Sequence, residues 1–143
     1  MNTLALFASG SGSNVENIYK YFVGNDKVKV GLVLTDNQNA YVIERAKKLN
    51  IPYIYFNYKE TSHDNVLKIL ASHKITHIAL GGYLRLIPKT IIRQFKNKIL
   101  NIHPSLLPKH GGKGYYGDYV HRSVLKENDK ESGITIHLVN EEY

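Results

Sequence analysis

Asn101 and His103 stand two residues apart where the apolar run at 99–102 gives way to the loop-like stretch PSLLPKHGGKGYYG. In an extended strand, side chains at positions i and i+2 point to the same side, so the amide and the imidazole are expected on one face and Ile102 on the other. An amide beside an imidazole can stabilise negative charge on a carbonyl oxygen, and an imidazole can also transfer a proton. The same residues are also compatible with a non-catalytic interpretation, in which His103 is a structural histidine and Asn101 an ordinary turn residue.

A second candidate site lies in ASGSGSN at residues 8–14, where an apolar run meets a helical pattern. Small residues allow close backbone approach, and free N–H groups at a helix start favour an anion such as phosphate. Val15 stands where the dinucleotide-binding glycine pattern needs its third glycine, so a monophosphate fits better than a dinucleotide. A plain tight turn remains open, with Ser13 and Glu16 forming a capping box at the helix start.

Strands and helices are predicted to alternate along the chain. Strands are expected at 3–8, 28–35, 51–56, 76–80, 98–102 and 134–140, and helices at 13–23, 40–49, 63–73, 88–95 and 117–127. Apolar runs separated by helical spacing are typical of βαβ units with parallel strands. The fold class is therefore α/β: a mostly parallel, twisted, Rossmann-like sheet with helices on both faces.

Length and composition exclude several classes of protein for this chain. A chain of 143 residues predicts one domain, and the lack of cysteine excludes disulfides and thiolate metal sites. No apolar run approaches the roughly 20 residues that span a bilayer, and no basic stretch precedes the first one, so a cytoplasmic protein without membrane contact is expected. The formal charge of +7 suits an anionic partner, but the lysines are scattered, which disfavours nucleic acid. No histidine pair has metal-site spacing on one helix.

Three motifs resemble, in chain order, those of the phosphoribosylglycinamide formyltransferase family: ASGSGSN, ALGGYLRLIP and ILNIHPSLLPKHGGKGYYG. The resemblance covers nearly the whole chain, and NIHPSLLP is its most specific part. It implies a site that binds the ribonucleotide phosphate, formed by Gly10, Ser11, Gly12, Ser13 and Asn14. It implies a folate site formed by Leu84, Arg85, Leu86, Ile87 and Asn101. Asn101 and His103 match the catalytic pair.

The family's reaction is implied with its substrates. The co-substrate is 10-formyltetrahydrofolate, whose formyl group passes to the amine of glycinamide ribonucleotide in purine biosynthesis, without a metal. Asn101 and protonated His103 stabilise the tetrahedral oxyanion, and a proton moves to the departing folate nitrogen. The implied partners are these small molecules alone, with a monomer or a homodimer as the oligomeric state.

Two features depart from the family pattern. The family's third catalytic residue is an aspartate that follows the strand expected at 134–140, and its position falls directly after Tyr143. The chain is therefore expected to be one α/β domain, residues 1–143, that lacks its C-terminal part and has weak or no activity by itself. In addition, His63 stands nearest to the position of an arginine through which the family contacts folate.

Two other classes of function remain open. One is a different formyltransferase, or a formyltetrahydrofolate hydrolase, of the same superfamily, because these proteins share the Asn-x-His core. The other is a non-catalytic module that binds folate or a phosphate ester without turnover. Ligand binding that survives the change His103→Ala, with no product formed by the wild type, would favour the module.

Overall fold

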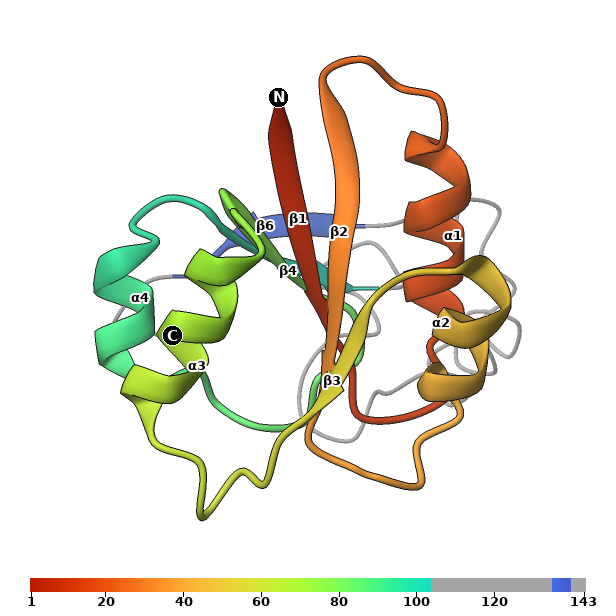
Figure 1. Cartoon of the computed structure of the whole chain (residues 1–143). Coiled ribbons are helices and arrows are strands. Elements are labelled where there is room, and N and C mark those ends of the chain that lie inside the picture. The colour runs from red at the N-terminus through yellow and green to blue at the C-terminus, as the bar shows by residue number, and fades with distance from the viewer. Residues whose placement is uncertain (104–134, 140–143) are drawn as a thin grey trace, which may run out of the picture.

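The computed structural model describes residues 1–103 and 135–139. In this part of the chain, strands and helices alternate as predicted (Figure 1). The strands are β1 (Asn2–Phe7), β2 (Val28–Thr35), β3 (Tyr53–Tyr55), β4 (His77–Leu80), β5 (Ile99–His103) and β6 (Thr135–Leu138). The helices are α1 (Ser13–Phe22), α2 (Val42–Leu49), α3 (His63–Ser72) and α4 (Lys89–Gln94).

The six strands form one sheet in the order β3-β2-β1-β4-β5-β6. The first five run parallel, and β6 pairs antiparallel with β5. The prediction of a mostly parallel α/β sheet is confirmed. Successive strands are added on one side of β1 up to β3 and on its other side from β4 onward, so a topological switch point lies between β1 and β4. Ligands of open α/β sheets bind at such a point, beyond the carboxyl ends of the strands.

Helices cover both faces of the sheet. Helices α1 and α2 lie on one side, and α3 and α4 lie on the other (Figure 1). In β1, Leu4 and Leu6 belong to the core under α1 and α2, whereas Ala5 and Phe7 belong to the core under α3 and α4. Both faces of the strand are therefore buried, which explains why its sequence is a continuous apolar run rather than an alternating one.

Several element ends coincide with the sequence expectations. The bounds of β2 match the prediction, and α1 ends before Gly24, whose φ is 79°. Pro88 is the N-cap of α4 rather than a residue of its first turn. The helix expected at 117–127 lies outside the described residues. Within the described ranges, no helix is long and apolar enough to cross a membrane.

Candidate active site

The loop that links β1 to α1 is held against the start of α2. Gly12 is buried and has a φ of 78°, a left-handed conformation that favours glycine. A Cβ at this position would lie 2.7 Å from the Cβ of Val42, and it would also collide with Val42 Cγ2. The Val42 N–H donates to the Gly10 carbonyl at 3.0 Å. Backbone contact with α2 thus requires glycine at position 12.

The capping box predicted for α1 is wrong. The N-cap is Gly12, one residue earlier than expected, and in the described structure no side chain caps this helix end. The Glu16 carboxylate instead accepts from Arg45 at 2.9 Å and lies 3.8 Å from Lys20 Nζ. The left-handed Gly12 moves the helix start by one residue, so Ser13 is helical and cannot act as the cap.

Arg45 connects α2 to this loop and to α1. Its Nε donates to the Ser11 carbonyl at 2.6 Å, while one terminal nitrogen donates to Glu16. The side chains of Arg45 and Glu16 are 23% and 28% exposed, so solvent screens this ion pair only in part. The guanidinium also lies 5.1 Å from the ring centroid of Tyr41. Arg45 therefore fixes the loop at Ser11, next to Gly12.

The start of α1 has the properties of an anion site. The first backbone N–H groups of a helix have no intrahelical acceptors, and the helix dipole adds partial positive charge there. Ser11 and Ser13 are exposed beside them, whereas Gly12 is buried. With no capping side chain described at this end, these donors can hydrogen-bond to a bound anion. Phosphate binding by residues 10–14 remains a prediction.

The sheet brings this loop close to Asn101. Leu80 of β4 is in register with both Phe7 of β1 and Asn101 of β5. The next residue is Gly81, where an added Cβ would lie 3.3 Å from the Cβ of Asn14. Gly81 thus lies between the start of α1 and the end of β5, where it is buried and contributes no side chain to the sheet edge.

The two faces of β5 differ as the sequence predicted. Ile102 is buried in the core under α1 and α2, whereas Ile99 is buried in the core under α3 and α4. Asn101 is half-buried and, by strand alternation, shares the face of Ile99. His103 is the last residue of β5 and lies in register with Thr135 of β6. The convergence of the Asn101 amide with the His103 imidazole stays a prediction.

The predicted folate segment, residues 84–87, is exposed except for its last residue. Ile87 is in the core, whereas Leu84 and Leu86 are 60% and 65% exposed. The partly buried Tyr83 packs edge-on against Phe7, with ring centroids 5.2 Å apart. Burial explains Ile87 as a core residue but leaves the two exposed leucines without a packing role.

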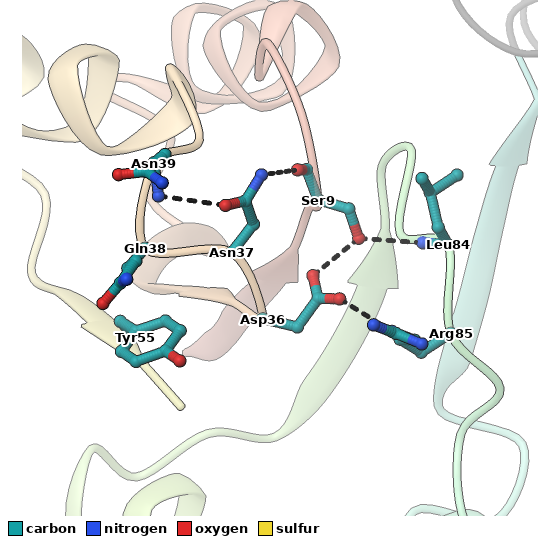
Figure 2. Close-up of a pocket in the computed structure, with 8 residues that line it drawn as sticks. All are labelled: Ser9, Asp36, Asn37, Gln38, Asn39, Tyr55, Leu84 and Arg85. Carbon is teal, nitrogen blue, oxygen red and sulfur yellow. Dashed lines mark hydrogen bonds and ion pairs between the residues drawn. The ribbon is translucent and has the colours of Figure 1, made fainter. Parts of the chain in front are cut away.

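A buried carboxylate beside this segment was missed by the sequence analysis. Asp36 follows β2, and its carboxylate accepts from Ser9 Oγ at 2.7 Å and from Arg85 Nε at 3.0 Å. Figure 2 shows these residues around a cavity of about 530 Å³, which Leu84 and Tyr55 also line. An acidic residue directly after a predicted strand of a parallel sheet was the available signal, because it must lie at the carboxyl edge.

His63 does not stand alone at the start of α3. Its Nδ1 lies 3.4 Å from Thr90 Oγ1, which places the imidazole against α4. The helix is capped by Ser62, whose hydroxyl accepts from the Asn65 N–H at 3.1 Å. Whether His63 takes the place of the family's arginine stays open.

The fold is that of the formyl transferases. The formyl transferase family model matches residues 2–143, and the chain belongs to this family. The phosphoribosylglycinamide formyltransferase of Bacillus subtilis is 38% identical over 149 residues, a match that covers 99% of this chain and 73% of that protein. The chloroplastic phosphoribosylglycinamide formyltransferase of Arabidopsis thaliana is 39% identical over 147 residues, covering 98% of this chain.

The chain spans 50% of the length of that plant relative. Among solved structures, glycinamide ribonucleotide transformylase 1 from Geobacillus kaustophilus superposes with a TM-score of 0.80 at 38% identity. That match covers 99% of this chain and 76% of the other. A formyltetrahydrofolate deformylase from Pseudomonas syringae matches with a TM-score of 0.71 at 21% identity, a likeness of fold alone.

Proposed function

We propose that the function of this chain is transfer of the formyl group of 10-formyltetrahydrofolate to the amine of glycinamide ribonucleotide, with weak or no turnover by residues 1–143 alone. One observation carries the proposal: Gly81 lies beside Asn14 at the start of α1 and follows Leu80, the register partner of Asn101. The residues that we propose to bind the phosphate and the formyl oxygen therefore lie at the same edge of the sheet. Membership of the formyl transferase family and the names of the relatives support the same reaction.

In this proposal, the ribonucleotide binds through its phosphate. Residues 10–14 supply backbone N–H groups, and Arg45 and Val42 hold the loop in place from α2. The rest of the ribonucleotide then extends over Gly81 toward Asn101. Folate binds beside it on residues 84–87, where Leu84 and Leu86 present exposed apolar side chains to a flat aromatic ring.

The chemical step needs one nucleophile, one electrophile and a stabilised oxyanion. The glycinamide nitrogen attacks the formyl carbon and forms a new C–N bond, and negative charge develops on the formyl oxygen. The Asn101 amide N–H and a protonated His103 stabilise that oxygen. The bond from carbon to the folate nitrogen then breaks, the attacking amine loses a proton, and the folate nitrogen gains one.

The proposal also covers the domain organisation, oligomeric state, cellular location and co-substrate of the protein. Residues 1–143 act as one α/β domain, as a monomer or a homodimer, in the cytoplasm. The co-substrate is 10-formyltetrahydrofolate, and the step described above uses no metal. The small-molecule substrates are the only partners proposed.

The proposal is tested with the 143-residue chain in excess over substrate, so that slow transfer can be detected in a single turnover. Binding of glycinamide ribonucleotide and of 10-formyltetrahydrofolate is measured in parallel. We expect both to bind saturably to the wild type, and any formylated ribonucleotide that forms to disappear in His103→Ala. Failure of either substrate to bind would contradict the proposal.

Two controls separate the alternatives. His73→Ala changes a histidine at the end of α3, whose ring contacts the Ile69 carbonyl, and leaves the edge near Asn101 intact. Binding that persists in His103→Ala, with no product from the wild type, would favour the non-catalytic module. Release of formate and tetrahydrofolate in the absence of ribonucleotide would favour the hydrolase.

A further inference from the structure

The carboxylate of Asp36 is buried at the point where three strand ends meet. Its side chain is 5% exposed, although it follows β2 in a surface turn. One oxygen accepts from the hydroxyl of Ser9, which follows β1, and the other accepts from the Nε of Arg85, which follows β4 (Figure 2). A charged group this deeply buried needs such donors, and here they come from two other segments.

Ser9 links the Asp36 carboxylate to the backbone of residues 84–87 through two hydrogen bonds. Its hydroxyl has a single hydrogen, which is donated to Asp36. The same oxygen accepts from the Leu84 N–H at 2.9 Å. Because the carboxylate fixes the direction of the hydroxyl hydrogen, it also fixes the lone pairs that meet the Leu84 amide. The Ser9–Asp36 pair thus sets the position of one backbone N–H.

Other contacts hold the neighbours of Leu84 but not Leu84 itself. The Ser9 N–H donates to the Gly82 carbonyl at 3.2 Å, and the Arg85 guanidinium lies 4.8 Å from the ring centroid of Tyr58. The Leu84 side chain is 60% exposed, so packing against the described residues restrains it little. The hydrogen bond to Ser9 is therefore the contact best placed to hold the Leu84 backbone.

Asp36 is poorly placed to bind a ligand directly. Both of its oxygens already have donors, and so little of the side chain is exposed that a ligand could reach it only by displacing Ser9 or Arg85. Arg85 is 47% exposed along its side chain but is held through its Nε and over Tyr58. The cluster of Asp36, Ser9 and Arg85 is therefore better suited to holding the backbone of residues 84–87 than to binding a ligand itself.

We propose that Asp36 and Ser9 are positioning residues for folate: they hold the backbone of Leu84 and Arg85 in the arrangement that the bound folate requires. This inference rests on the proposed function, in which residues 84–87 line the folate site. Under this inference, binding of the ribonucleotide does not depend on Asp36. The two substrates should therefore respond differently when the carboxylate is neutralised.

The test compares Asp36→Asn with a matched control, Asp26→Asn, at an exposed turn before β2. Affinities are measured for 5-formyltetrahydrofolate, a stable isomer of the co-substrate, and for glycinamide ribonucleotide. Loss of charge-assisted hydrogen bonds at a preorganised site predicts a roughly tenfold weaker affinity of Asp36→Asn for the folate. Its affinity for the ribonucleotide, and both affinities of Asp26→Asn, should stay within about twofold of the wild type.

A second variant and a second measurement cover the case in which Asp36→Asn folds poorly. Ser9→Ala keeps Asp36 paired with Arg85 but removes the acceptor for the Leu84 N–H. Hydrogen exchange at the Leu84 amide should then quicken by about tenfold or more, with the amides of β1 and β4 unchanged. Ser72→Ala, on the exposed end of α3, serves as the matched control.

Each outcome is decisive. Selective loss of folate affinity together with faster Leu84 exchange supports the inference. Equal loss of both affinities would show a merely structural role and overturn it, as would unchanged folate affinity. A wild type that binds the ribonucleotide but no folate would contradict the proposed function, and the Leu84 exchange rate would still decide whether Ser9 and Asp36 hold the segment.

Discussion

Leu80 and Asn101 are register partners in the neighbouring parallel strands β4 and β5, and the residue after Leu80 is a glycine that packs against Asn14. Asn101 shares the face of α3 and α4, whereas α1 begins on the opposite face. A ligand that contacts both must therefore lie across the carboxyl edge of the sheet. Gly81 lies on that path and contributes no side chain to it.

Gly12→Ala should weaken the packing of the loop between β1 and α1 against α2. The substitution adds the cost of a left-handed conformation, about 1 kcal/mol, and a clash with Val42 that costs about 1–3 kcal/mol more. We expect a lower free energy of unfolding in urea and a weaker affinity for glycinamide ribonucleotide. Gly24→Ala is the matched control, since its φ is 79° but nothing lies within 4 Å of the added Cβ. A Gly12→Ala protein no less stable than Gly24→Ala would contradict the packing argument.

Arg45→Ala should loosen the same loop from the other side. The side chain loses an exposed bond to Ser11 and a partly buried bond to Glu16, which predicts about 1–2 kcal/mol of lost stability. Lys47→Ala removes an exposed ion pair with Glu44 and should cost less than about 0.5 kcal/mol. Thermal unfolding of the two variants measures the difference. Equal melting temperatures would show that Arg45 does not hold the loop.

Leu86→Ser should lower folate affinity while leaving stability nearly unchanged. Leu86 is 65% exposed, so its replacement costs little core packing, within about 0.5 kcal/mol. Val23→Ser is a control with similar exposure, 62%, far from the 84–87 segment in the chain. Titration with 5-formyltetrahydrofolate and urea denaturation give the two quantities. Unchanged folate affinity in Leu86→Ser would remove that side chain from the proposed site.

Asn101→Ala and His103→Ala should each slow formyl transfer. Loss of a single oxyanion donor costs about 10²–10³ in rate, and loss of a proton-transferring histidine about 10²–10⁴. Because the two act on one oxygen, the double variant should be slower by less than the product of the two factors. Single-turnover rates of the three variants check this. Strictly multiplicative losses would show that the two residues act independently.

Much of the fold could be predicted because buried parallel strands have a plain signature. Residues 28–35 are mostly apolar and β-branched, and β2 has those bounds. Strand alternation likewise predicted the burial of Ile102 opposite Asn101. These predictions depend on local periodicity, which the sequence displays directly.

The parts that local patterns missed depend on contacts between distant segments. Asp36 and Arg85 are 49 residues apart, and only the sheet order places the ends of β2 and β4 near enough to pair. The capping box failed because Val42 of α2 packs on Gly12, a contact that spacing around Ser13 does not reveal. The antiparallel direction of β6 also depends on tertiary structure.

The most direct test of the proposed active site is a crystal structure of this chain with glycinamide ribonucleotide bound. We predict phosphate oxygens at about 2.7–3.2 Å from backbone nitrogens of residues 12–14, with the glycinamide amine over Gly81 and directed toward Asn101. A phosphate bound away from the start of α1, or an amine directed away from Asn101, would contradict the account.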